Sequence, residues 1–297
     1  MMGNSVEQRM AIRGRAGTRP RWRVSDLWKA PLTDLPIRDE ILYQFAEFAP
    51  EMDLLEIGPG SGFPTIQLAR LVRHLTTVDV AEPNIARLRP VFASVSNIRL
   101  LAGDISDPHV VDDIGMRFDA IEAVEVFEYV PNPRVALQNM TALLYPGGQL
   151  YLQYPNVPGV GVTFFESRDE LFSALSDAGF VDIRIDLLRL RPWASLLYRY
   201  LHEKPLHAFR RARQRSRPAQ PHTYEATWAF REGSTFDNFK PPIHLAWTVL
   251  LFLMRLGGDC FERLPADDIF RKNLLVVATC TIEGGVRCSN LKTTSAV

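Results

Sequence analysis

Residues 52–62 read MDLLEIGPGSG, and this stretch decides the fold. Residues 52–57 are a short apolar run, which is typical of a buried β-strand. The run ends in the glycines Gly58, Gly60 and Gly62, and an apolar helical period then predicts a helix over residues 63–75. A glycine turn between a strand and a helix lets the backbone approach a ligand at the amino end of the helix. A glycine triplet alone would also suit an ordinary tight turn. The residues around it are therefore needed to distinguish a ligand-binding turn from an ordinary one.

Strands and helices keep alternating beyond this turn as far as residue 154. Alternation of this kind builds βαβ units and a parallel sheet. We therefore expect an α/β fold with a Rossmann-like, doubly wound, mostly parallel seven-stranded sheet and a helical insertion between its last two strands. The strands are expected over residues 52–57, 75–80, 98–102, 118–126, 149–154, 181–187 and 274–282, and the later helices over residues 82–94, 134–144 and 169–178.

The chain divides into four regions by composition. Residues 1–25 are expected to be a basic disordered tail, because residues 1–23 hold six Arg and one Glu. Residues 26–188 plus 273–283 would form the sheet domain, and residues 284–297 a small polar tail. Residues 189–272 are too long for a loop, so we interpret them as a helical subdomain that acts as a substrate lid.

Overall composition excludes several classes of protein. The 297 residues carry 34 Lys plus Arg and 34 Asp plus Glu, which excludes a globally basic DNA-binding protein. The longest apolar stretch, LAWTVLLFLM at residues 245–254, is too short to span a membrane. Three cysteines without a C-x-x-C pair argue against a disulfide framework or a structural zinc site, and no secretory signal is recognisable. We expect a cytoplasmic protein.

Two acidic residues follow predicted strands at positions suited to a nucleotide. Asp79 lies 23 residues after Glu56, at the end of the second strand, where an acid can accept both hydroxyls of a ribose. Asp104 follows the third strand, where it could accept from an adenine amino group or simply cap a helix.

The segment from residue 52 to 156 resembles the class I methyltransferases that use S-adenosyl-L-methionine (SAM), in particular the small-molecule members related to the ubiquinone methyltransferases. LEIGPGSG resembles the first motif of that family, and TTVDVAEPN resembles the motif after it. FDAIEAVEVFEYVPNP and LLYPGGQLYLQYPN resemble the motifs around the fourth and fifth strands. The ordered set of four is specific, although any one motif alone is not.

The resemblance implies a cofactor and a set of roles, carried over by position. SAM would be the cofactor, and Glu56 would orient the glycine loop or reach the amino-acid end of SAM. The other implied residues all line the cofactor: Gly58, Gly60 and Gly62 in the loop, Asp79 on the ribose, Val80 on the adenine, Asp104 and Ile105 beside the adenine, and Glu125 near both SAM and the acceptor.

The run after the fourth strand departs from the family pattern. Quinone O-methyltransferases often read E-x-x-E-H there, whereas this chain has Glu125, Glu128 and then Tyr129 in place of the histidine. A tyrosine, with an ordinary pKa of about 10, is a poor base, so we expect neither a histidine base nor a metal at this position. The candidate catalytic residues are Glu125, Glu128 and His222, and a reaction on an amine or stabilised carbon would need no base.

We therefore expect a SAM-dependent methyltransferase that acts on a small, hydrophobic molecule, with O-methylation favoured. Three alternatives stay open. Residues 193–217 alternate aromatic residues and Leu with Arg, and residues 243–257 are almost wholly apolar. The segment 193–257 would therefore suit peripheral contact with a membrane and a lipid acceptor. The same basic residues would suit an RNA substrate, which is a less favoured interpretation. A SAM-binding sensor or scaffold without catalysis is the third.

Overall fold

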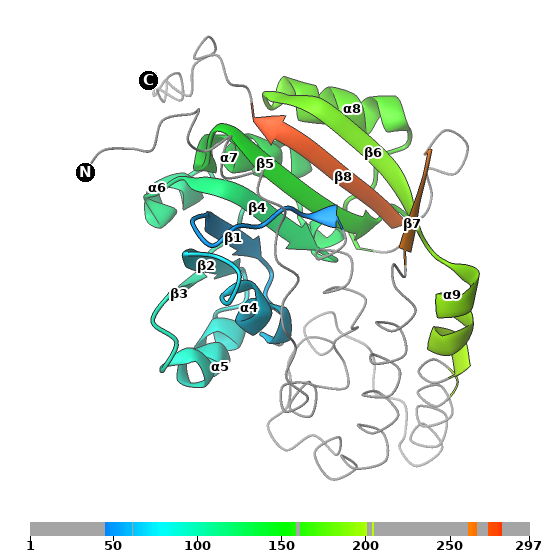
Figure 1. Cartoon of the computed structure of the whole chain (residues 1–297). Helices are drawn as coiled ribbons and strands as arrows, with labels where there is room; N and C mark the ends of the chain where they lie inside the picture. The colour runs from blue at the N-terminus through cyan, green and yellow to red at the C-terminus, as the bar shows by residue number, and fades with distance from the viewer. Residues whose placement is uncertain are drawn as a thin grey trace, which may run out of the picture.

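A computed structural model describes residues 45–60, 62–158, 161–200, 204, 261–265 and 273–280. In this part of the chain, eight strands form one sheet in the order β3-β2-β1-β4-β5-β8-β6-β7 (Figure 1). The strands are β1 (Asp53–Ile57), β2 (His74–Asp79), β3 (Ile98–Ala102), β4 (Phe118–Val124), β5 (Leu144–Pro155), β6 (Phe180–Leu190), β7 (Phe261–Pro265) and β8 (Asn273–Cys280). The helices are α4 (Phe63–Leu68), α5 (Glu82–Phe92), α6 (Val110–Ile114), η1 (Phe127–Tyr129), α7 (Pro133–Leu143), α8 (Arg168–Asp177) and α9 (Pro192–Tyr198).

The first five strands run parallel and are wound outward from β1 in both directions. β1 pairs with β2 on one side and with β4 on the other, and every residue of β1 and β4 is buried. Burial on both faces explains why these strands are nearly continuous apolar runs in the sequence. The α/β fold with a doubly wound, mostly parallel sheet is confirmed, and its strand order reverses between β1 and β4, where such sheets bind ligands.

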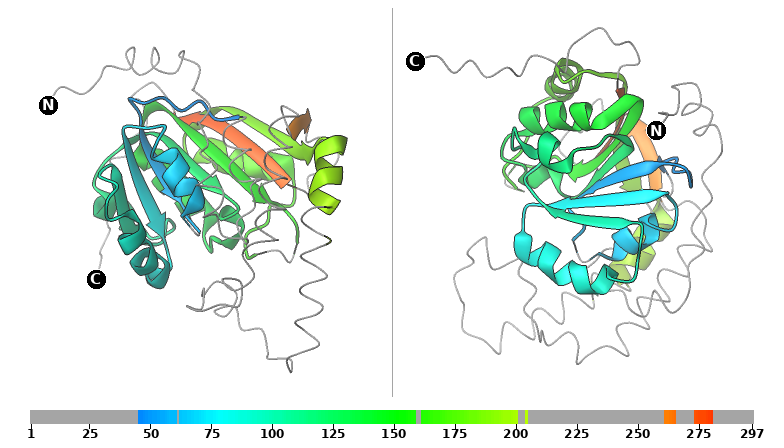
Figure 2. Two further views of the ribbon diagram at one scale, coloured as in Figure 1. Left: turned by 60° about the horizontal axis from the view of Figure 1, so that its bottom comes forward. Right: turned by 90° about the vertical axis from the view of Figure 1, so that its left-hand side faces the viewer.

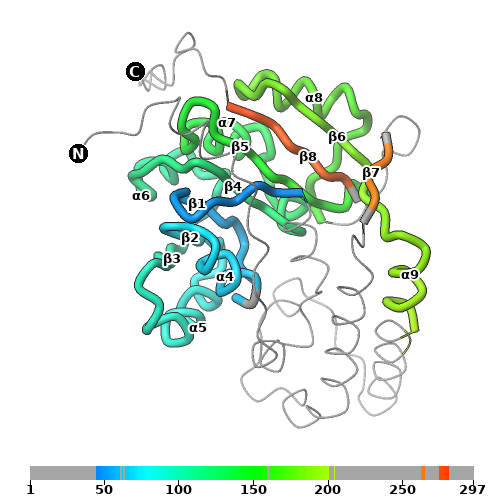
Figure 3. The backbone as a smooth tube through the Cα atoms, viewed as in Figure 1, coloured from blue at the N-terminus to red at the C-terminus, as the bar shows by residue number. Residues whose placement is uncertain are grey.

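The other end of the sheet is antiparallel. Strand β8 is antiparallel to both β5 and β6. Figure 3 traces β8 as the red segment between these two strands. Strand β7 then pairs, again antiparallel, with residues 186–190 at the carboxyl end of β6. The prediction of seven strands is therefore wrong, because β7 adds an eighth from residues 261–265, inside the range expected to be a helical insertion. Its sequence, FERLP, lacks an apolar run and ends in proline, which suits the short edge strand that it forms.

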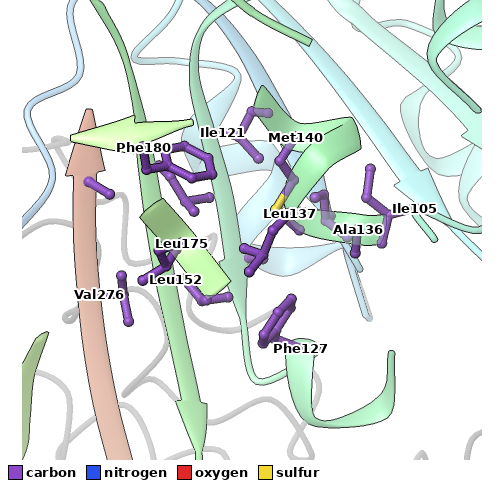
Figure 4. Packing of buried hydrophobic residues seen from close by; sticks show 14 of the residues in the cluster. Ile105, Ile121, Phe127, Ala136, Leu137, Met140, Leu152, Leu175, Phe180 and Val276 are labelled. Atoms are coloured by element: carbon purple, nitrogen blue, oxygen red, sulfur yellow. The ribbon is translucent and has the colours of Figure 1, made fainter. Parts of the chain in front are cut away.

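Helices cover both faces of the sheet. Figure 2 shows α4 and α5 on one face and α6, α7 and α8 on the other. Helix α7 buries residues at helical spacing, among them Ala136, Leu137 and Met140, against strand residues such as Ile121 and Leu152 (Figure 4). This apolar layer holds β4 and β5 in place, and those two strands support the loop that follows β4.

Helix α4 is shorter than the sequence predicts. It ends at Leu68 instead of residue 75, and Leu71 and Val72 are buried in the turn that follows. The N–H of Arg73 donates to the carbonyl of Met52 at 2.9 Å, which draws the chain toward β1 and starts β2. The apolar period continues past the helix because Leu71 and Val72 in the turn and Leu75 in β2 are buried in the same cluster as Leu68 of the helix.

An ion pair at the amino ends of β1 and β2 ties these two strands together. The buried Asp53 carboxylate accepts hydrogen bonds from Arg73 Nε at 3.0 Å and Arg73 Nη2 at 2.6 Å, and His74 Nδ1 lies 3.0 Å from Asp53 Oδ1. Burial by itself raises the pKa of Asp53, but the hydrogen bonds and charges of Arg73 and His74 outweigh burial. The pKa of Asp53 therefore lies below its usual value of 3.8.

This lowered pKa predicts how Asp53 contributes to stability across pH. A carboxyl with a lower pKa in the folded protein stabilises the fold above its unfolded-state pKa and loses that contribution as pH falls. Asp53→Asn should lower the free energy of unfolding by about 1–3 kcal/mol at pH 7. Urea unfolding at pH 5 and pH 3, which bracket the ordinary pKa of an aspartate, measures the loss: the deficit of the variant should shrink at pH 3, and an equal deficit at both would contradict the account.

The remaining sequence predictions about domains fall mostly outside the described residues. The tails at 1–25 and 284–297 and most of the segment 189–272 lie there, so their assignments stay predictions. Within the described ranges, no helix has the length and apolar character needed to cross a membrane.

Candidate functional site

The predicted site residues follow the carboxyl ends of parallel strands, which meet at one edge of the sheet. In the register of the sheet, Ile57 pairs with Val78 and Ala123, so β1, β2 and β4 end at nearly the same level. Asp79 pairs with Ala102, which brings the end of β3 to that level. The glycine loop, Asp79, Asp104 and Glu125 thus lie at one edge of the sheet.

The glycine loop adopts a shape that other residues would strain. Gly58, Gly60 and Gly62 all have positive φ, at 73°, 55° and 85°. A Cβ on Gly58 would lie 2.2 Å from Val126 Cγ2, and a Cβ on Gly62 would lie 2.6 Å from Leu88 Cδ2. The N–H of Gly58 donates to the carbonyl of Val78 at 2.8 Å, which fastens the start of the loop to β2. Glycine is therefore required by both the backbone conformation and the close packing.

Glu56, just before the glycine loop, links the elements around the loop through hydrogen bonds to its side chain. Its buried carboxylate accepts from Thr65 Oγ1 at 3.0 Å and from Thr77 Oγ1 at 2.5 Å, and so links β1 with the first turn of α4 and with β2. The sequence left two roles open for Glu56, and this geometry favours the one in which it orients the loop. Hydrogen bonds to a buried carboxylate are stronger than those between neutral groups.

Asp79 anchors a chain of hydrogen bonds that ends on the glycine loop. Its Oδ1 accepts from the N–H of Ala81 at 2.8 Å, and its Oδ2 accepts from Asn84 Nδ2 at 2.6 Å. Arg87 Nη2 in turn donates to Asn84 Oδ1 at 2.6 Å and to the carbonyl of Gly60 at 2.9 Å. Sequence reasoning missed Asn84 and Arg87. Their signal is the spacing of three on a helix that begins just after Asp79, which puts both on one face of the helix.

Val80, Asp104 and Ile105 differ in exposure. Val80 is 73% exposed directly after β2, so its side chain is available to a ligand. Asp104 Oδ1 accepts from both the N–H and the hydroxyl of Ser106, which makes a local turn rather than a cap on α6. Ile105 is buried in the core shown in Figure 4, so its side chain supports the loop from the interior.

The loop after β4 carries the two predicted glutamates in different settings. Glu125 is half-buried with a φ of 53°, a conformation that non-glycine residues seldom adopt, and its N–H donates to the carbonyl of Gln153 at 2.7 Å. Glu128 is only 2% exposed, in η1. Its carbonyl accepts from the N–H groups of Val162 and Thr163, which lie beyond β5. Glu125 is thus accessible and Glu128 is enclosed.

Tyr154, whose ring packs against Phe127 of η1, bears on proton transfer near this loop. Burial, together with the charges of Glu128 and Glu170, raises the pKa of Tyr154 far above its usual value, so this phenol stays protonated. Among the described residues, no three His, Cys, Asp or Glu side chains gather to hold a metal ion. His222, the third predicted catalytic residue, lies outside the described residues.

Comparison with known proteins gives a family for this arrangement. A family model described as a methyltransferase domain matches residues 33–212. The ubiquinone biosynthesis O-methyltransferase of Xanthomonas axonopodis pv. citri (strain 306) is 30% identical over 138 residues, which are 46% of this chain and 56% of that protein. The protein of the same name from Xanthomonas euvesicatoria pv. vesicatoria (strain 85-10) is 28% identical over 137 residues, with the same two coverages.

A solved structure is also similar to this chain. The N-methyltransferase NodS from Bradyrhizobium japonicum WM9 is 26% identical, with a TM-score of 0.41, over 51% of this chain and 88% of that one. The region matched in the two Xanthomonas proteins spans only 56% of their length, so their names describe more protein than the matched region covers.

Proposed function

The chain belongs to the family of SAM-dependent methyltransferase domains, and from this premise we propose that it transfers the methyl group of SAM to a small, hydrophobic acceptor. The observation that carries the proposal is the shared edge of the glycine loop, Asp79 and Glu125. A hydroxyl oxygen is the favoured methylated atom, because the two Xanthomonas relatives are named as O-methyltransferases.

The residues at this edge fit the cofactor by their chemistry. When bound, SAM supplies an electrophilic methyl group on a positively charged sulfur. The Asp79 carboxylate would accept the ribose hydroxyls, and the exposed Val80 would pack on the adenine. Gly58, Gly60 and Gly62 would let the backbone of the loop lie close to the amino-acid end, with Glu56 keeping that loop in place.

On the acceptor side, Glu125 is the better candidate for a proton acceptor. It is partly accessible beside the glycine loop, whereas Glu128 is enclosed and its backbone supports the segment after β5. A base would take the proton of an acceptor hydroxyl as the oxygen attacks, and alignment of donor and acceptor would supply most of the rate. Val162, 65% exposed and hydrogen-bonded through its N–H to Glu128, would add apolar surface for a hydrophobic acceptor.

Calorimetry and a methyl-transfer assay test the proposal together. The full chain should bind SAM and its demethylated product S-adenosylhomocysteine (SAH) with micromolar affinity. Turnover should then be measured on phenols of rising hydrophobicity, simple amines, lipid vesicles and RNA. Methylation of the apolar phenols at low enzyme concentration is the expected result.

Glu125→Gln separates catalysis from cofactor binding in the same assay. The variant should lower kcat on a phenol while the Kd for SAH stays within about twofold, the pattern of an interaction made in the transition state. Asp182→Asn is the matched control, because Asp182 also has a positive φ, at 51°, but lies at the start of β6. An unchanged kcat in Glu125→Gln would exclude Glu125 as a base. Binding of SAH without turnover on any acceptor would favour a sensor or scaffold.

A further inference from the structure

The chain of hydrogen bonds from Asp79 to Gly60 joins two parts of the candidate cofactor site. Asp79 ends β2, and Gly60 lies in the middle of the loop between β1 and α4. They are linked through two side chains of α5, Asn84 and Arg87, by hydrogen bonds of 2.6 Å, 2.6 Å and 2.9 Å. A single helix face therefore touches both ends of the site.

The direction of these hydrogen bonds matches the charges. Arg87 always carries a positive charge and donates to the Asn84 oxygen, so the Asn84 amide nitrogen is left to donate to the Asp79 carboxylate. The neutral amide of Asn84 therefore lies between the Arg87 cation and the Asp79 anion and is hydrogen-bonded to both. Arg87 reaches Asn84 and Gly60 through the same atom, Nη2, which has two N–H groups, so this one nitrogen bridges the two residues.

The Asp79 carboxylate can still accept hydrogen bonds from a ligand while Ala81 and Asn84 hold it in place. An ionised carboxylate can accept about four hydrogen bonds, and the N–H of Ala81 and the amide of Asn84 use two of them. Two hydroxyls of one ribose can take the rest. The existing contacts fix the orientation of the carboxylate before a ligand arrives, so little ordering remains to be done on binding.

We propose that Asn84 and Arg87 are positioning residues that couple the ribose-binding carboxylate to the glycine loop. This inference rests on the proposed function and adds two residues to its site. A ligand that spans both parts, such as SAH, benefits from the coupling. Adenosine reaches the Asp79 part and lacks the amino-acid end, so it benefits little. Loss of Arg87 therefore changes the ratio of the two affinities, an effect that a merely structural residue would not produce.

Arg87→Met tests the coupling, with Arg89→Met as its matched control. Arg89 lies on the same helix, is more than half exposed, and pairs with Glu82 at 3.5 Å, away from the chain of hydrogen bonds. Calorimetry with the full chain should show SAH binding weakened about tenfold in Arg87→Met and adenosine binding by less than about twofold. Arg89→Met should match the wild type for both ligands, and Arg87→Lys should recover part of the SAH affinity because a donor returns.

A double variant tests whether the two residues act as one unit. If they do, Asn84→Ala with Arg87→Met weakens SAH binding no more than the stronger single variant, whereas independent residues would multiply their effects. Thermal unfolding of each variant checks that the fold persists. Three results would each overturn this inference and leave the proposed function standing. In the first, Arg87→Met binds SAH as tightly as the wild type does. In the second, Arg87→Met loses as much affinity for adenosine as for SAH, and in the third, the double variant shows the product of the two single effects. Absence of SAH binding to the wild type would overturn the proposed function as well.

Discussion

Asp79→Ala should weaken SAH binding by about 100- to 10,000-fold, because each of two ribose hydroxyls loses a hydrogen bond to a charged acceptor. Such hydrogen bonds contribute about 1.5–3 kcal/mol each, and 1.4 kcal/mol corresponds to a tenfold change in affinity. The variant also leaves the N–H of Ala81 and the amide of Asn84 without their acceptor, so the coupling to Gly60 is lost at the same time. Calorimetry with SAH measures the change.

Asp107→Ala is the control for this prediction. Asp107 Oδ1 accepts from the N–H of His109, two residues on, just as Asp79 Oδ1 accepts from Ala81. The control therefore removes the same local hydrogen bond at an exposed position and should leave the Kd for SAH unchanged. A loss of less than about fivefold in Asp79→Ala would mean that this carboxylate does not bind the ribose.

Much of the parallel half of the fold could be predicted from local pattern. Strands β1 and β4 are mostly apolar because both faces are buried, and the glycines after β1 mark the turn into a helix. The expected third strand, residues 98–102, matches β3 residue for residue. The antiparallel edge was harder to predict, because β7 is short, two charged residues interrupt its apolar ones, and its pairing with β6 joins Leu190 to Phe261, which are far apart in the chain.

Site residues could be predicted from the sequence where they directly follow a predicted strand. Residues that reach the site only through contacts with other side chains could not. Gly58 and Asp79 follow strands and stand out for that reason. Asn84 and Arg87 resemble ordinary surface residues of a helix, and only the fold brings Arg87 to the carbonyl of Gly60. Glu128 resembles Glu125 in sequence, yet a segment more than thirty residues later covers it through the N–H groups of Val162 and Thr163.

Gly58→Ala is expected to have the largest effect on stability, because two independent costs fall on one position. A left-handed conformation costs a non-glycine residue about 1–2 kcal/mol. The new Cβ would also lie 2.2 Å from Val126 Cγ2, and overpacking of this kind costs about 1–3 kcal/mol more. Urea unfolding should therefore show a loss of about 2–5 kcal/mol, with SAH binding weakened because the loop is displaced.

Two companion variants separate these costs. Gly115→Ala has a similar positive φ, at 67°, but its Cβ would meet only Asp112 O at 3.4 Å, so it should show the conformational cost alone. Gly58→Ala combined with Val126→Ala removes the crowding methyl groups and should be more stable than the sum of the single effects predicts. If Gly58→Ala were no more destabilising than Gly115→Ala, the close contact with Val126 would not be what requires glycine at this turn. The backbone conformation would then be the sole reason for the first glycine of the loop.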